Sequence, residues 1–210
     1  MRDWNGNKAS VRANLGVVQK GNVADRQSED FYATEPAAIE LLLQHYTLPY
    51  CIWECACGMG HIAKVLESAG HFVYSTDLMD RGYGSSGVDF LQTTAMPDWC
   101  KCILTNPPYK YTTEFVLHSL ELLPVGGVCA MLLNISYISG KQRYEAIYKQ
   151  NPPKVVYVFT GRVSCAKNGD FDNFGGSAIN YGWFIWEKGY TGEPVIRWLQ
   201  TDNKNNILSK

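Results

Sequence analysis

Residues 50–77 decide the fold, and they read YCIWECACGMGHIAKVLESAGHFVYSTD. The apolar run at 50–53 is typical of a buried strand, and a glycine-containing turn follows it. Apolar residues then recur at helical spacing until Gly70, which ends the helix. A second apolar run at 72–76 leads into Asp77. The segment is therefore predicted to form a strand, a tight turn, a helix and a second strand.

The turn of this unit carries Gly58 and Gly60, which allow a sharp bend and a close approach of a ligand to the backbone. Asp77 follows about 20 residues later, where a carboxylate can accept hydrogen bonds from ribose hydroxyls. Together with Ala63, these residues also satisfy the fingerprint of nicotinamide dinucleotide-binding proteins. The motif therefore leaves open an NAD-binding oxidoreductase and a plain strand–helix–strand unit without a ligand.

A second motif, Asn106-Pro107-Pro108-Tyr109, follows an apolar run at 101–105. Proline has no N–H to donate to a strand ladder, so the strand must end here, at the sheet edge where open α/β sheets bind ligands. The amide oxygen of Asn106 and a backbone carbonyl could accept both hydrogens of an exocyclic amine, and Tyr109 could stack on its ring. Taken alone, the pattern suits a planar amine such as adenine and a proline-rich turn with a capping Asn about equally.

The two motifs, in this order, resemble those of the class I S-adenosylmethionine-dependent methyltransferases, specifically the enzymes that methylate the N6 amine of adenine. The resemblance covers about residues 30–190, and the opening around Trp4 is similar to that of phage- or prophage-encoded DNA adenine methyltransferases. It implies a Rossmann-like fold, S-adenosylmethionine as the cofactor and DNA as the substrate. The same chemistry on RNA adenine or on a protein glutamine is an alternative, and a non-catalytic cofactor-binding subunit is another.

The resemblance also implies a role for each matching residue. The tetrapeptide at 106–109 is the implied catalytic motif. The implied cofactor contacts come from the segment before the first strand, the glycine turn, the ribose acid and an Asp-Phe pair, and they are Phe31, Thr34, Glu54, Ala56, Gly58, Gly60, Asp77, Asp89 and Phe90. Of these, Phe90 fits a core position about as well, and Thr34 fits a helix cap.

Contact with a nucleic acid is expected from loops near the same sheet edge. The candidates are Lys110, Tyr111, Lys141, Arg143, Arg162 and Lys167. Phosphate binding by such Lys and Arg side chains is sensitive to salt, although each one also fits ordinary solvated surface charge. The formal net charge of -1 gives no global attraction to a nucleic acid, so any contact must come from a local patch.

The alternation of strands and helices predicts an α/β fold with a mostly parallel sheet and helices on both faces. The resemblance implies that this sheet has seven strands and a terminal antiparallel hairpin. We expect a polar arm at 1–29, a single domain at 30–200 and a tail at 201–210. Helices are predicted at 35–46, 61–69, 112–123 and 142–149. Strands are predicted at 50–55, 72–77, 86–90, 101–105, 128–133, 155–159, 181–186 and 195–198.

The chain has seven cysteines, an odd number that argues against a complete disulfide framework. Reduced thiols are typical of the cytoplasm, and no signal peptide or membrane-spanning run is expected. A metal site at Cys55, Cys57 and His61 is conceivable, but one residue between the cysteines is fewer than zinc ligands need. We therefore expect no metal and no membrane contact.

Overall fold

The computed structural model describes residues 32–167, 169, 171 and 179–201. The predicted arm at 1–29, the cofactor contact at Phe31 and the tail from 202 onward lie outside the described residues.

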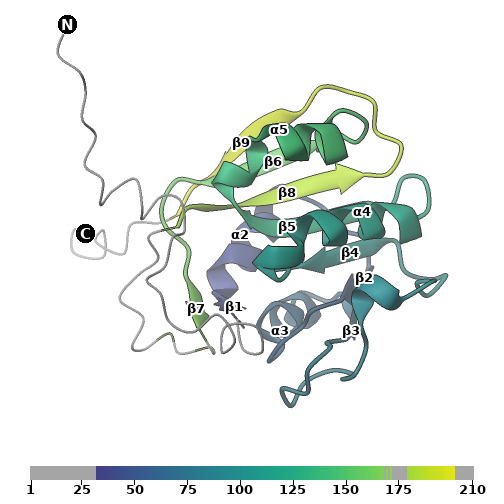
Figure 1. Ribbon diagram of the computed structural model, residues 1–210. Helices are drawn as coiled ribbons and strands as arrows, with labels where there is room; N and C mark the ends of the chain where they lie inside the picture. The colour runs from purple at the N-terminus through teal and green to yellow at the C-terminus, as the bar shows by residue number, and fades with distance from the viewer. Residues whose placement is uncertain (1–31, 168, 170, 172–178, 202–210) are drawn as a thin grey trace, which may run out of the picture.

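A sheet of seven strands organises the fold, in the order β3-β2-β4-β5-β8-β6-β9 (Figure 1). The strands are β2 (Cys51–Glu54), β3 (Phe72–Ser75), β4 (Cys102–Thr105), β5 (Val128–Asn134), β6 (Val155–Phe159), β8 (Tyr181–Glu187) and β9 (Val195–Leu199). All neighbouring strands run parallel except β8, which lies antiparallel between β5 and β6. The expected mostly parallel sheet with an antiparallel hairpin, here β6 with β8, is confirmed.

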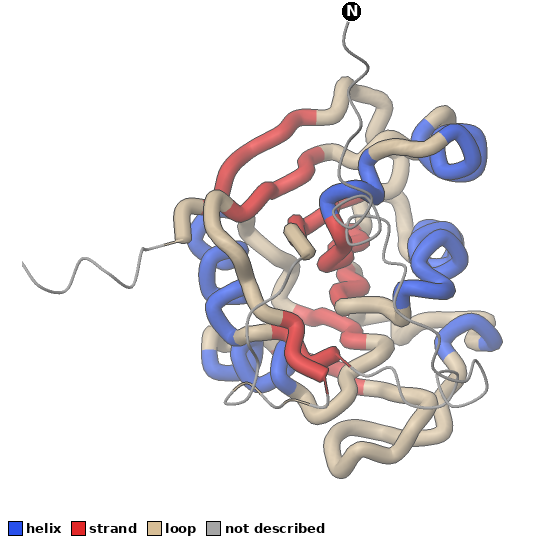
Figure 2. Tube along the Cα trace, turned by 60° about the vertical axis from the view of Figure 1, so that its left-hand side comes forward, coloured by secondary structure: helices blue, strands red, loops and turns tan. Residues whose placement is uncertain are grey.

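Helices cover both faces of the sheet, as Figure 2 shows. On one face, α2 (Pro36–His45) and α3 (His61–Ser68) pack against Ile52 and its neighbours. On the other face, α4 (Thr112–Leu122) and the π-helical turn η4 (Tyr144–Tyr148), which continues the short α5 (Lys141–Arg143), pack against Trp53 and its neighbours. Successive strand residues thus point to opposite faces, and both faces are buried because helices cover each of them.

The strand expected at 86–90 is absent from the described structure, and this prediction was wrong. Residues 78–87 form an irregular loop, and its β-pairing with the rest of the chain is one isolated bridge between Thr76 and Ser85. Gly87 has a φ of 74°, outside the extended region, and Asp89 caps the 3₁₀ turn η1 (Phe90–Gln92). The other seven predicted strands form the sheet, and the last of them, predicted at 195–198, is β9 at the opposite edge, parallel to β6.

A separate two-stranded ribbon was not predicted. It pairs β1 (Tyr32–Thr34) with β7 (Cys165–Lys167) in antiparallel register, with Thr34 opposite Cys165 (Figure 1). No strand was predicted between residues 159 and 181. Three-residue strands leave no readable periodicity, and the partner lies about 130 residues away, so local patterns carry no signal for this pairing.

Candidate active site

The glycine turn and the Asn-Pro-Pro-Tyr motif are neighbours at the carboxyl edge of the sheet. Strands β2 and β4 lie side by side and parallel, with Trp53 paired to Ile103. Both motifs therefore leave the sheet at the same end. Thr105 Oγ1 donates to the carbonyl oxygen of Ala56 at 3.5 Å, a direct contact between the two segments. The short turn η2 (Tyr109–Tyr111) and α4 then follow the motif.

The side-chain amide of Asn106 has a fixed orientation. Its Nδ2 donates to the carbonyl oxygen of Tyr32 at 3.1 Å and to Thr34 Oγ1 at 3.2 Å. Since a carbonyl oxygen can only accept, the nitrogen must face β1 and the oxygen must face away from it. Within the described residues, Asn106 Oδ1 is buried and has no hydrogen-bond partner. Such an acceptor is costly when left unpaired, and it suits an N–H donor from a ligand.

Tyr109 lies in a stack of three tyrosines. Its ring centroid is 5.6 Å from that of Tyr32 and 6.3 Å from that of Tyr181. The hydroxyls of Tyr109 and Tyr181 are 2.6 Å apart, and burial raises the pKa of both phenols, so both stay neutral. Tyr109 still exposes 41% of its surface, although its ring stacks on both neighbouring tyrosines.

Cys165 also lies beside the Asn106 amide. Its sulfur lies 3.9 Å from Asn106 Nδ2, and burial raises the pKa of the thiol to about 12. The group is therefore a neutral thiol rather than a nucleophilic thiolate near neutral pH. The sequence did not single out Tyr32, Cys165 or Tyr181, because only the tertiary fold brings them to Asn106.

The glycine turn is tied to the end of β3 by Asp77. The backbone N–H of Gly58 donates to Asp77 Oδ2 at 2.7 Å, and that of Met79 donates to Asp77 Oδ1 at 2.8 Å. Gly58 and Gly60 have φ values of 56° and 76°, which other residues rarely adopt. Asp77 thus has a structural role in shaping the turn, and the predicted ribose contact would use the remaining acceptor capacity of its carboxylate.

Tyr83, which the sequence analysis missed, covers the turn from the 78–87 loop. A Cβ atom added at Gly60 would lie 2.5 Å from the Tyr83 ring, so only glycine fits beneath it. The Tyr83 hydroxyl donates to Glu67 Oε2 at 3.0 Å, which fixes the ring over the start of α3.

Glu54, at the end of β2, is a buried carboxyl group with only 1% of its surface exposed. Its Oε2 atom has no hydrogen-bond partner among the described residues. Burial raises the pKa of Glu54 well above its usual value. A hydrogen bond from the Ala63 backbone opposes this shift, and the nearby Asp77 charge adds to it.

Replacing Glu54 by Gln should stabilise the ligand-free protein by an amount that grows with pH. Below the usual pKa of 4.5 both folded and unfolded chains hold the proton, so the substitution changes little. As pH rises further, the unfolded chain releases its proton first, and wild-type stability falls by up to about 1.4 kcal/mol per pH unit until the folded pKa is reached. Urea unfolding of both proteins at about pH 5 and about pH 8 measures the difference. A difference that does not change with pH would contradict a buried proton on Glu54.

Asp89 and Phe90 have clear structural roles. Asp89 is exposed, and its Oδ1 accepts from the Leu91 backbone N–H at 3.0 Å, which caps η1. Phe90 is buried in the core, with its ring centroid 5.3 Å from that of Trp53 and 4.9 Å from that of Phe115. Their contact with the cofactor adenine stays a prediction, and for Phe90 core packing accounts for the residue.

The candidate nucleic-acid contacts are spread over several elements. Lys110 and Tyr111 are exposed beside the tetrapeptide, with Lys110 Nζ 5.1 Å from the Tyr111 ring centroid. Lys141 and Arg162 are also exposed. Lys167 belongs to β7, but its side chain lies outside the described residues.

Arg143, another candidate, is held within its own turn. Its guanidinium donates to the carbonyl oxygens of Ser136 and Ser139 and lies 4.7 Å from the Tyr137 ring centroid. These contacts stabilise the 3₁₀ turn η3 (Ile135–Ile138), so Arg143 is less available for phosphate than the exposed lysines.

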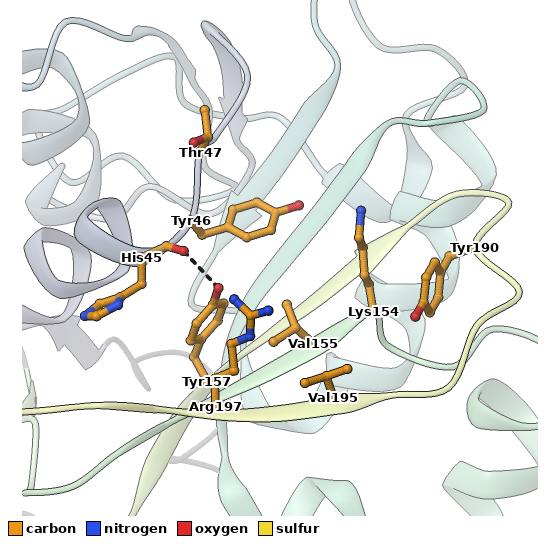
Figure 3. Close-up of a pocket in the computed structure, with 9 residues that line it drawn as sticks. All are labelled: His45, Tyr46, Thr47, Lys154, Val155, Tyr157, Tyr190, Val195 and Arg197. Atoms are coloured by element: carbon orange, nitrogen blue, oxygen red, sulfur yellow. Dashed lines mark hydrogen bonds between the residues drawn. The ribbon is translucent and has the colours of Figure 1, made fainter.

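A cavity of about 240 Å³ lies at the opposite, amino-terminal edge of the parallel strands (Figure 3). Lys154, Tyr157 and Arg197 are among the residues that line it, and the Tyr157 hydroxyl donates to the His45 carbonyl oxygen at 3.0 Å. Lys154 is paired with Glu187 at 2.6 Å. None of the predicted site residues lines this cavity.

Three further features concern the described part of the chain. All seven cysteines are free thiols, and six of them are buried. No three His, Cys, Asp or Glu side chains in this part are grouped to hold a metal ion. No described helix has the length and apolar character needed to cross a membrane.

Comparison with solved structures identifies the fold. A candidate class I S-adenosylmethionine-dependent methyltransferase from Listeria monocytogenes superposes with a TM-score of 0.53 and 12% identity, over 91% of this chain and 71% of that one. A modification subunit of a candidate type I restriction enzyme from Vibrio vulnificus superposes with a TM-score of 0.54 and 14% identity, over 87% of this chain and 49% of that one. A candidate RNA methyltransferase from Pyrococcus horikoshii superposes with a TM-score of 0.51 and 13% identity, over 72% of this chain and 83% of that one. No family model matches the sequence, and no curated protein is significantly similar to it.

The chain therefore has the Rossmann-like fold of the class I methyltransferases. The antiparallel β8 inserted between β5 and β6 separates this sheet from the strand order 3-2-1-4-5-6 of the dinucleotide-binding fold. The topology thus argues against the NAD-binding alternative that the glycine motif left open.

Proposed function

We propose that the protein transfers a methyl group from S-adenosylmethionine to the exocyclic N6 amine of adenine in DNA. The observation that carries this proposal is the buried, unpartnered Oδ1 of Asn106, which lies at the same sheet edge as the glycine turn. The fold supports methyl transfer, and the resemblance of the tetrapeptide at 106–109 to that of adenine methyltransferases supports the choice of amine.

The residues around the turn fit the proposed cofactor. The unpaired Oε2 of Glu54 is suited to a cationic donor such as the methionine ammonium, whose approach would lower the pKa of the carboxyl and release its proton. Gly58 and Gly60 would lie against the cofactor, and Asp77 would contact its ribose. When bound, the cofactor supplies an electrophilic methyl group on a sulfonium ion.

Asn106 and Pro107 would activate the amine. The lone pair of the adenine amine is delocalised into the ring, which makes the nitrogen a poor nucleophile. Acceptance of its two hydrogens by Asn106 Oδ1 and the Pro107 carbonyl oxygen favours a pyramidal nitrogen with a directed lone pair. These oxygens would also stabilise the positive charge that develops on nitrogen as the new carbon–nitrogen bond forms and the sulfur–methyl bond breaks, which leaves a neutral thioether. The methylated amine is then acidic enough to lose one proton to water, so no general base is required.

The burial of Asn106 Oδ1 limits whether the reacting adenine can be part of a base-paired duplex. An adenine within a duplex cannot reach the buried Oδ1 of Asn106, so the base must be flipped out or come from a single strand. Tyr109 offers the aromatic face on which the base would stack, in place of part of its present contact with Tyr32 or Tyr181. Exposed Lys110 and Arg162 could contact the flanking phosphates.

DNA is favoured over RNA by the resemblance and by the fold neighbour that is a restriction-enzyme modification subunit. RNA remains the second candidate, because another neighbour of similar TM-score is a candidate RNA methyltransferase. The structure offers the same acceptors to adenine in either polymer.

The test is transfer of labelled methyl groups to methylation-free DNA, RNA and a protein mixture, followed by analysis of the hydrolysed nucleosides and amino acids. We expect label in N6-methyladenine from DNA. Label found only in RNA adenine or only in protein glutamine would identify that alternative as the substrate. Cofactor binding without label in any substrate would support a non-catalytic subunit.

A further inference from the structure

We propose that Thr34 is a positioning residue, whose hydroxyl oxygen holds the Asn106 amide so that Oδ1 faces the substrate amine. This inference rests on the proposed function, because it concerns the same methyl transfer. It also differs from the cofactor contact that the resemblance implies for Thr34. The structure assigns the hydroxyl oxygen to Asn106, at 3.2 Å from Nδ2.

Asn106 Nδ2 carries two hydrogens, and the structure offers one acceptor for each. The Tyr32 carbonyl oxygen lies at 3.1 Å and Thr34 Oγ1 at 3.2 Å. The Cys165 sulfur, at 3.9 Å, is a weak third acceptor. A rotation of the amide by half a turn would place Oδ1 against the Tyr32 carbonyl, where two oxygens repel. The surroundings therefore permit one orientation of the amide.

The element that carries Thr34 is itself anchored. Thr34 is 3% exposed and lies opposite Cys165 in the ribbon of β1 and β7. The next residue, Glu35, receives the Ser164 backbone N–H at Oε2 at 2.9 Å and donates its own N–H to the Ser164 carbonyl at 3.0 Å. Thr34 does not cap α2, because the cap position is Glu35. The ribbon thus holds Thr34 Oγ1 in place as an acceptor for Asn106 Nδ2, and Asn106 Oδ1 is left to face the substrate amine.

The test compares Thr34→Val, which removes the acceptor at nearly constant volume, with Thr34→Ser, which keeps it. We expect kcat for methyl transfer to DNA to fall about tenfold or more in Thr34→Val, because small misplacements of a reacting group are costly. The dissociation constant of S-adenosylmethionine, measured by calorimetry, should not change. Thr34→Ser should retain most of the wild-type kcat.

A second readout does not require catalysis. The side-chain N–H signals of Asn106, identified by their loss in Asn106→Ala, should exchange slowly with water in the wild type and in Thr34→Ser. They should exchange faster in Thr34→Val. Thr76→Val is the matched stability control, since buried Thr76 Oγ1 likewise accepts from a side-chain N–H, that of Trp53 at 2.9 Å.

The inference would be overturned if Thr34→Val lost affinity for S-adenosylmethionine but kept kcat at saturating cofactor, which is the pattern of a cofactor contact. It would also be overturned if kcat fell as far in Thr34→Ser as in Thr34→Val. The same holds if the Asn106 side-chain N–H signals exchanged at the same rate in the wild type and in both Thr34 variants. A wild type that methylates nothing but shows the expected Asn106 signals would refute the proposed function and leave the positioning of the amide supported.

Discussion

Replacing Asn106 by Ala is expected to lower the rate of methyl transfer to DNA adenine by about 10²- to 10³-fold, the usual loss for a preorganised group that stabilises developing charge. The substitution removes Oδ1, the buried acceptor without a partner. Since Glu54 and the glycine turn are untouched, the affinity for S-adenosylmethionine should stay close to that of the wild type. Single-turnover transfer of labelled methyl groups measures the first quantity, and calorimetry measures the second.

Asn134→Ala is the matched control. Asn134 ends the neighbouring strand β5, and its Oδ1 accepts from the Ser136 backbone N–H at 2.9 Å, so its amide has a capping role. The control should lose about 1 kcal/mol of stability and keep most of the transfer rate. Wild-type transfer by Asn106→Ala, or equal losses in the two variants, would refute the role assigned to Asn106.

Replacing Gly60 by Ala is expected to have the largest effect on stability. Its φ of 76° costs an alanine about 1–2 kcal/mol. The added Cβ would also lie 2.5 Å from the Tyr83 ring, and such overpacking costs about 1–3 kcal/mol more. We therefore expect the free energy of unfolding to fall by about 2–5 kcal/mol, measured by urea denaturation. Affinity for S-adenosylmethionine should fall as well, because the turn must shift.

Replacing Gly82 by Ala is the control that measures the cost of the positive φ alone. It has the same φ of 76°, and no atom lies within 4 Å of an added Cβ. Gly82→Ala should therefore show only the backbone cost of about 1–2 kcal/mol. Adding Tyr83→Ala to Gly60→Ala should be less destabilising than the separate effects predict, because it removes the clash. Equal losses in Gly60→Ala and Gly82→Ala would contradict the close packing of Tyr83 on the turn.

Much of the sheet could be predicted from local patterns. The apolar runs that became β2, β3, β4, β5, β6, β8 and β9 are bounded by glycine, proline or polar residues, which mark strand ends. The antiparallel course of β8 was implied by the resemblance, and the absence of a predicted helix between β6 and β8 allowed it. The position of the tetrapeptide at the carboxyl edge of the sheet could be predicted, because open α/β sheets bind ligands there, but the pairing of β2 with β4 comes from the structure.

What the sequence did not predict depends on contacts between distant segments. Asn106 could be named, but its orientation depends on Tyr32 and Thr34, more than 70 positions away. Tyr181 and Cys165 reach the same corner through β8 and β7, and neither residue type is distinctive at its position. The strand wrongly predicted at 86–90 had apolar residues, but Gly87 at a positive φ and the side-chain cap of Asp89 gave this segment another conformation.

The ribbon of β1 and β7 has a consequence for how the protein acquires activity during synthesis. Tyr32 and Thr34 are synthesised well before their partners in this site, because Cys165, which pairs with Thr34, and Tyr181, which meets Tyr109, follow about 130 or more residues later. Contacts of such long sequence separation form late, because closing a long loop is entropically unfavourable. A nascent or prematurely released chain would thus contain both motifs but lack the ribbon that orients the amide. The orientation of the Asn106 amide would therefore be complete only after β7 and β8 have been synthesised and have folded onto the sheet edge.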